Sequence, residues 1–118
     1  IKRIGYDPFQ STQFVTRMEK QGLKMVEVPA TVLQFSDPMK EIAALIISGR
    51  LHHNGDPVLS WAVGNVIAKT DAKENVYPRK AREENKIDPA VAMIANMNLW
   101  GREKNVVSIY ETRGLVTL

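Results

Sequence analysis

The stretch Ile4-Gly5-Tyr6-Asp7-Pro8 decides how the rest of the chain is interpreted. Three residues that suit a buried strand lead into a carboxylate, and Pro8 ends the strand because it has no backbone N–H to donate. The helical pattern that follows places Asp7 between a strand and a helix. In open α/β sheets, ligands bind at this carboxyl edge of the strands. Asp7 is therefore a candidate site residue, and a site would need a second acid at the same edge.

A strand–helix–strand unit is predicted around this stretch. Residues 2–7 suit a strand, and residues 11–21 carry apolar side chains at helical spacing before Gly22 ends the helix. Residues 23–28 predict the second strand. Such units are right-handed with parallel strands, and a parallel pair is covered on both faces, so we expect further helices.

Asp-Pro pairs occur at three further places in the chain. Each predicts a helix start with Asp as N-cap and Pro at the first helical position; they lie at 37–38, 56–57 and 88–89. For Asp37 and Asp56 this capping role is a sufficient explanation. We expect residues 30–36 to form a loop or short strand.

A hairpin and a tail complete the predicted elements. Residues 66–69 and 76–78 predict two antiparallel strands, and Pro78 confines the second to an edge. We expect residues 105–118 to form a tail with an extra strand at 106–110.

The composition is that of one globular domain. The chain has 118 residues, 44% apolar and 25% charged. It contains no cysteine, which excludes disulfides and thiolate metal sites, and no apolar run approaches the ~20 residues that span a bilayer. These features fit a cytoplasmic protein. The net charge of +3 is compatible with a polyanionic partner, and the strand-like start at Ile1 leads us to expect a piece of a longer protein.

Asp7 and Asp88 together suit a divalent cation. Carboxylate oxygens are the ligands that Mg²⁺ and Mn²⁺ prefer, and such ions activate water and clamp phosphodiesters in nucleases. Lys80, Arg82 and Lys86 precede Asp88 and would hold a phosphate backbone. The alternative for Asp7 is a turn, and for the basic segment a solvated, salt-bridged loop.

Other polar and aromatic residues carry less information. His52 and His53 adjoin each other, but no third metal ligand at helical spacing accompanies them. Trp61 occupies a packing position, which favours a core role over base stacking. Asn65 follows Gly64 and could cap a helix while facing the site.

Several segments together resemble one protein family. They are Ile4 to Phe9, the run Gly-Arg-Leu-His-His-Asn-Gly-Asp-Pro-Val-Leu-Ser-Trp at 49–61, Asn65, and Lys-Ile-Asp-Pro-Ala-Val-Ala at 86–92. In order and spacing they resemble the C-terminal nuclease domain of tailed-phage terminase large subunits over roughly residues 2–100. The resemblance implies an α/β, RNase H-like (resolvase/integrase-like) fold that is incomplete here, with a central strand–helix–strand unit and flanking helices.

The resemblance also implies a site. Family members hold two Mg²⁺ or Mn²⁺ ions with three acids, of which the second matches Asp7 and the third matches Asp88. The first would lie upstream of residue 1, in a three-stranded antiparallel portion that the chain lacks, as it lacks the ATPase domain. We therefore expect residues 1–104 to be the C-terminal part of the nuclease domain and to be inactive, or nearly so, alone.

The implied activity is endonucleolytic cutting of concatemeric viral DNA during packaging. The partners would be double-stranded DNA, the terminase small subunit and the portal protein, with no membrane. Charge and position add Arg79, Lys80 and Lys86 as DNA contacts, and an exposed sheet edge invites a homo-oligomer. The rival interpretations are another RNase H-like nuclease (a junction resolvase or transposase) and a non-catalytic interaction module whose acids are caps.

Overall fold

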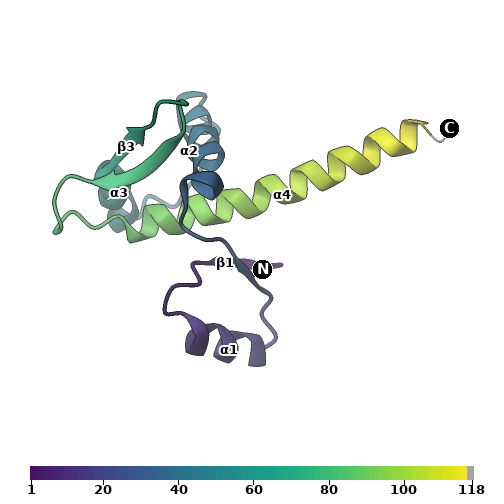
Figure 1. The fold of residues 1–118 in the computed structure, drawn as a ribbon, viewed down its shortest axis with the longest axis horizontal. Coiled ribbons are helices and arrows are strands. Elements are labelled where there is room, and N and C mark those ends of the chain that lie inside the picture. The colour runs from purple at the N-terminus through teal and green to yellow at the C-terminus, as the bar shows by residue number, and fades with distance from the viewer. Residues whose placement is uncertain (117–118) are drawn as a thin grey trace.

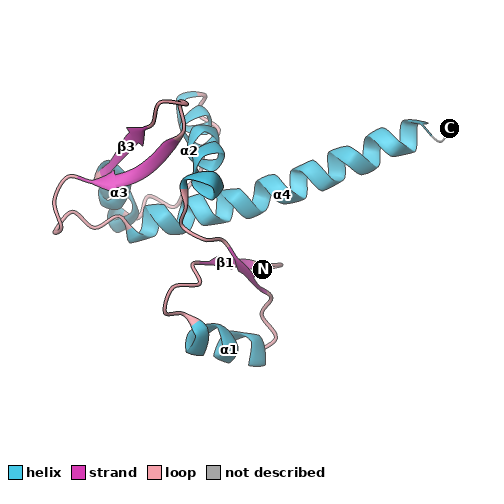
Figure 2. Ribbon diagram, in the orientation of Figure 1, coloured by secondary structure: helices cyan, strands magenta, loops and turns pink. Residues whose placement is uncertain are grey.

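The computed structural model describes residues 1–116, and the side chains of residues 1–104. The elements in chain order are β1 (Ile4–Tyr6), α1 (Thr12–Lys20), β2 (Met25–Glu27), α2 (Val32–Ile47), α3 (Pro57–Gly64), β3 (Val66–Thr70), β4 (Val76–Lys80) and α4 (Asp88–Val116). The strands, magenta in Figure 2, pair as two separate two-stranded sheets. The chain is therefore an α/β structure with small sheets.

The strand–helix–strand unit is confirmed. β1 and β2 pair in parallel, with Ile4 opposite Met25 and Tyr6 opposite Glu27. Ser11 stands before α1, and Gly22 follows its end with φ +84°, a left-handed conformation that glycine adopts without a steric penalty. Val15 is the buried residue of α1, whereas the neighbouring Phe14 is exposed.

Helix α4 lies at the centre of the molecule. In Figure 1 the β1–α1–β2 unit lies on one side of α4, and α2, α3 and the β3–β4 hairpin lie on the other. Both groups contact it: α2, α3 and β1 all pack against α4. The expectation that the strand–helix–strand unit is central was therefore wrong. The long helix α4 has other elements packed on two of its sides, whereas the short parallel pair packs against α4 from one side.

The extra strand expected at 106–110 is also absent, since these residues continue α4 to Val116. The valines and isoleucine there favour a strand locally. A strand, however, needs a partner edge, whereas an established helix grows by adding one hydrogen bond for each residue that is fixed.

The core lies between α2, α4 and the strands. Its buried members are Val28, Phe35, Ile42, Ile94, Ala95 and Leu99. Phe35 and Val28 are each only 1% exposed, and full burial of such side chains stabilises by roughly 1.5–3 kcal/mol each. The ring of Tyr77 on β4 stacks on Phe35 with centroids 6.1 Å apart, which fixes the hairpin to α2.

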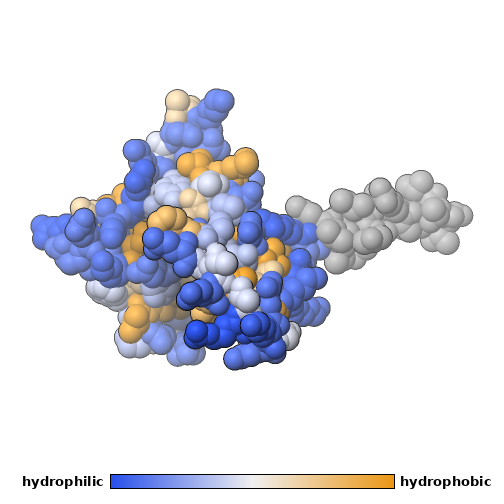
Figure 3. Space-filling view, turned by 60° about the horizontal axis from the view of Figure 1, so that its bottom comes forward, coloured by the Kyte–Doolittle hydropathy of each residue, from blue (hydrophilic) through white to orange (hydrophobic). Residues whose placement is uncertain are grey.

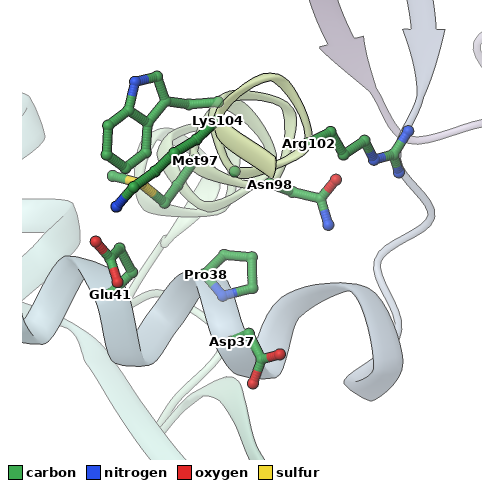
Figure 4. A pocket seen from close by; sticks show the side chains of 9 residues that line it. Asp37, Pro38, Glu41, Met97, Asn98, Arg102 and Lys104 are labelled. Atoms are coloured by element: carbon green, nitrogen blue, oxygen red, sulfur yellow. The ribbon is translucent and has the colours of Figure 1, made fainter. Parts of the chain in front are cut away.

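Helix α2 starts earlier than the Asp-Pro pair predicts. Thr31 caps it, with its Oγ1 accepting from the N–H of Gln34 at 3.3 Å, so the N-cap role of Asp37 was wrong. Pro38 then lies inside the helix, where it cannot donate to the carbonyl of Gln34. That carbonyl accepts instead from Asn98 Nδ2 on α4 at 2.8 Å. Figure 4 shows Pro38 facing Asn98 across the two helices. The proline is tolerated because α4 supplies the missing donor.

Helix α3 begins as predicted. Asp56 Oδ1 accepts from the N–H of Val58 at 2.8 Å and of Leu59 at 3.2 Å, and Pro57 is the first helical residue. Trp61, expected in the core, is 50% exposed, whereas its neighbour Ala62 is fully buried. Helix α3 packs against α4, and Ala62 is its buried residue.

The hairpin is confirmed with its register. Val66 pairs with Lys80 and Thr70 with Val76, and Pro78 lies opposite Ala68. A two-stranded sheet has only edge strands, which makes Pro78 acceptable. The turn is held by Asp71, whose Oδ1 accepts from the N–H groups of Lys73 at 2.8 Å and Asn75 at 3.0 Å.

Among the described residues, no helix combines the length and the apolar character that a membrane crossing demands.

Candidate functional site

Asp7 lies directly after β1 and is exposed. Its Oδ1 accepts from the N–H of Phe9 at 3.0 Å, and its carbonyl accepts from Ser11 Oγ at 2.7 Å. Gln10, between them, has φ +53°, a left-handed conformation that costs a non-glycine residue free energy. The loop is thus held in one shape. One carboxylate oxygen belongs to the turn, and Oδ2 faces solvent without a hydrogen bond from the described side chains.

Asp88 is the first residue of α4 and is also exposed. A carboxylate in the first turn is favoured by the helix dipole. Within residues 1–104, no hydrogen bond or ion pair engages its side chain, so the expected N-cap bond is not formed there. The loop before it is tied to α3, because Asn65 Nδ2 donates to the carbonyl of Lys86 at 3.1 Å.

The packing of β1 on α4 brings the two acids toward one end of the helix. Arg3 forms an ion pair with Glu103 at 2.6 Å. Further along the strand, Gly5 lies against Leu99 and the Ala95 carbonyl. The strand therefore runs opposite to α4, as Figure 1 shows, and moves toward the N-terminal end of the helix. Asp7 lies about 7 Å beyond Gly5 in that direction. Asp88 lies about 10 Å along the helix from Ala95, also toward the N-terminal end of α4.

Asp7 and Asp88 are the metal ligands that the sequence predicts, and both are exposed. Exposed carboxylates at one end of a helix are suitable oxygen ligands for Mg²⁺ or Mn²⁺. In the part of the chain that is described, no three histidines or acids gather in a way that could hold a metal. The set is thus incomplete for two-metal chemistry. His53 belongs elsewhere, since its Nδ1 accepts from the N–H of Gly55 at 3.0 Å within a turn.

The three basic residues predicted to contact DNA do not all lie on the same side of the molecule. Lys80 is exposed at the end of β4 and pairs in register with Val66, the residue after Asn65. Lys86 is exposed two residues before Asp88. Side chains alternate along a strand, so Arg79 points to the other face, where its guanidinium lies 5.5 Å from the centre of the Tyr77 ring. Lys80 and Lys86, but not Arg79, therefore lie at the corner where α4 begins.

Asp71 and Glu103 each have a lowered pKa. A hydrogen bond from Asn75 lowers the pKa of Asp71 in the hairpin turn. The Arg3 guanidinium, first by hydrogen bonding and then by its charge, lowers the pKa of Glu103. Both interactions stabilise structure: the first the hairpin turn, the second the β1–α4 contact.

One pocket lies on a different part of the molecule, between α2 and α4. A cavity of about 350 Å³ separates α2 from α4 and is lined by acids of α2 and bases of α4, among them Asp37, Glu41, Arg102 and Lys104 (Figure 4). Asp7 and Asp88 do not line it. On the face drawn in Figure 3, hydrophilic side chains prevail with separate apolar patches between them.

Comparison with known proteins defines the class. The family model described as "Terminase large subunit, endonuclease domain" matches residues 1–104. The chain therefore belongs to the terminase large-subunit endonuclease domain family. "Protein YmfN" of Escherichia coli (strain K12) is 38% identical over 123 residues, which is 100% of this chain and 27% of that protein.

A solved structure shares the fold. The crystal structure of the HK97 bacteriophage large terminase superposes with a TM-score of 0.71 and 24% sequence identity, over 82% of this chain and 21% of that one. The chain thus spans about a quarter of the length of these relatives.

Proposed function

We propose that this chain is part of a metal-dependent endonuclease in which Asp7 and Asp88 are metal ligands. The observation that supports it best is the opposite course of β1 and α4, because it carries a strand-end acid toward the end of α4 at which the helix-start acid lies. Family membership supplies the reaction class, and we propose that the full domain has the RNase H-like fold. A third acid from outside residues 1–118 would complete the ligand set.

The described residues would divide the work as follows. Asp7 Oδ2 and the Asp88 carboxylate would hold the cation, and the fixed loop around Asp7 would keep its carboxylate in place when DNA binds. A bound Mg²⁺ or Mn²⁺ supplies charge neutralisation and an acidic water. Lys80 and Lys86 would hold the flanking phosphates of double-stranded DNA. Arg79 lies over Tyr77, and its predicted DNA contact would require the hairpin's other face to meet the duplex.

In its full-length context, we propose, this activity cuts concatemeric viral DNA during packaging. The HK97 bacteriophage large terminase shares the fold. The terminase small subunit and the portal protein would be the protein partners. By itself the chain should not nick a plasmid efficiently in Mn²⁺, because the ligand set is incomplete; efficient nicking that Asp7→Ala abolishes would overturn this view.

Mn²⁺ titration followed by NMR tests the metal role. Paramagnetic Mn²⁺ broadens amide signals near its site even when binding is weak. We expect selective broadening around residues 7 and 88, reduced by Asp7→Asn and by Asp88→Asn. Asp37→Asn is the matched control, since it removes an exposed carboxylate of another Asp-Pro pair that lines the separate cavity. Broadening that is unchanged in both site variants would favour the non-catalytic interaction module.

DNA binding tests the basic residues. Each phosphate contact that is lost should reduce the slope of log K against log salt by about 0.9. Lys80→Ala and Lys86→Ala should each show such a reduction, whereas Lys20→Ala on α1, on the other side of α4, should not. An unchanged affinity and slope in both variants would remove these contacts from the proposal.

A further inference from the structure

Asn65 joins two parts of the chain that meet beside Asp88. It follows α3 as its C-cap, with its backbone N–H donating to the carbonyls of Trp61 at 3.1 Å and Ala62 at 3.2 Å. Ala62 is fully buried where α3 packs on α4. The backbone of Asn65 is therefore fixed to the packed part of the molecule.

The side chain of Asn65 reaches the segment that leads into α4. Its Nδ2 donates to the carbonyl of Lys86 at 3.1 Å, across 21 positions of sequence. The bonds otherwise found within residues 81–87 are local turn bonds, such as Asn85 N–H to Arg82 O at 3.1 Å and Lys86 N–H to Glu84 O at 3.0 Å. Two described side chains from other elements donate to this exposed segment: Lys80 Nζ at the end of β4 reaches the Glu83 carbonyl at 3.4 Å, and Asn65 reaches the Lys86 carbonyl, two residues before Asp88.

We propose that Asn65 is a positioning residue for Asp88, an inference that rests on the proposed metal role of Asp88. By holding the Lys86 carbonyl, it fixes where the first turn of α4 begins and hence where the carboxylate stands. A neutral amide suits this place. It donates a hydrogen bond without the positive charge that would repel a cation and without the negative charge that would compete for it.

A double-mutant cycle isolates this role. One hydrogen bond of ordinary net strength corresponds to about a fivefold change in an equilibrium constant. Asn65→Ala should therefore weaken Mn²⁺ binding about fivefold, measured by broadening of amide signals, in the parent chain and equally in an Asp7→Asn background. In an Asp88→Asn background it should change nothing further, because the residue through which it acts is gone.

Asn75→Ala provides the matched control. Asn75 Nδ2 also donates to a polar oxygen, Asp71 Oδ2 at 3.1 Å, but in the hairpin turn. Asn75→Ala should lower Tm about as much as Asn65→Ala does and should leave Mn²⁺ affinity unchanged. A purely structural role for Asn65 would make the two variants alike.

The outcomes separate the two proposals. If Mn²⁺ binds near residues 7 and 88 and Asn65→Ala binds it as tightly as the parent, the positioning role is wrong and the metal site stands. A loss in Asn65→Ala that persists in full in the Asp88→Asn background also overturns the positioning role. If Mn²⁺ broadens neither region in the parent, the metal site itself fails, and the role of Asn65 with it.

Discussion

Replacement of Gly5 by valine tests the strand–helix contact on which the site depends. A Cβ at Gly5 would lie 3.2 Å from Leu99 Cδ1, 3.3 Å from Val28 Cγ2 and 3.5 Å from the Ala95 carbonyl oxygen. The first two distances are already tight, and the two γ-methyl groups of valine extend further into filled space. The Leu99 and Val28 side chains would have to give way to the Cβ, and the Ala95 backbone beside it leaves little room for the γ-methyl groups, so we expect β1 to move away from α4.

The expected magnitude follows from two opposing effects. Overpacking of this kind costs up to about 3 kcal/mol, and the reduced freedom of the unfolded chain returns about 1 kcal/mol. The free energy of unfolding should therefore fall by about 2 kcal/mol, which for a chain of this size lowers Tm by about 8 °C. Circular dichroism during heating and in urea measures both quantities.

Gly101→Ala is the control for this variant. Gly101 lies inside α4, and nothing stands within 4 Å of the Cβ that would be added. Helix propensity then predicts a gain of about 1 kcal/mol. The packing argument is refuted if Gly5→Val is as stable as the parent, or if the two glycine variants shift Tm in the same direction.

Two further predictions concern the contacts of α4. Asn98→Ala should lower the free energy of unfolding by about 1–3 kcal/mol, because it leaves the Gln34 carbonyl without a donor. In a Pro38→Ala background, which restores a helical N–H for that carbonyl, the loss should be smaller. Urea unfolding measures both losses, and equal losses in the two backgrounds would contradict this account. Arg3 lowers the pKa of Glu103 from the ordinary 4.5. The ion pair therefore stabilises the folded protein above pH 4.5, and this stabilisation is lost as the pH falls through the lowered pKa. Tm should therefore drop less between pH 6 and pH 3 in Glu103→Gln than in the parent, and parallel curves would exclude the ion pair as a source of stability.

Local signals predicted much of the fold. The parallel pair, Asp56 as cap and the hairpin were confirmed, because each depends on a local pattern or on nearby turn or capping chemistry. The start of α4 at Asp88 was also confirmed, although the cap bond predicted for Asp88 is not found among the described side chains. The start of α2 could not be predicted in this way. Its Asp-Pro pair looks like a helix start, but Thr31 caps the helix, and Pro38 is tolerated inside it because Asn98, sixty-four positions after Gln34, donates to the Gln34 carbonyl.

Long-range packing decided the remaining differences. The central place of α4, the exposed Trp61 and the helical tail all depend on which surfaces are covered, and a local pattern does not specify that. Gly5 did carry a signal, since an isolated glycine in a strand often marks close backbone approach. The roles of Asp7 and Asp88 stay predictions, and the course of β1 along α4 is what now supports them.

A crystal grown with Mn²⁺ tests the central claim most directly. The account predicts an anomalous peak at bonding distance from carboxylate oxygens of both Asp7 and Asp88. Carboxylates that point apart, with Asp7 held by the N–H of Phe9 alone and no Mn²⁺ beside either residue, would contradict it.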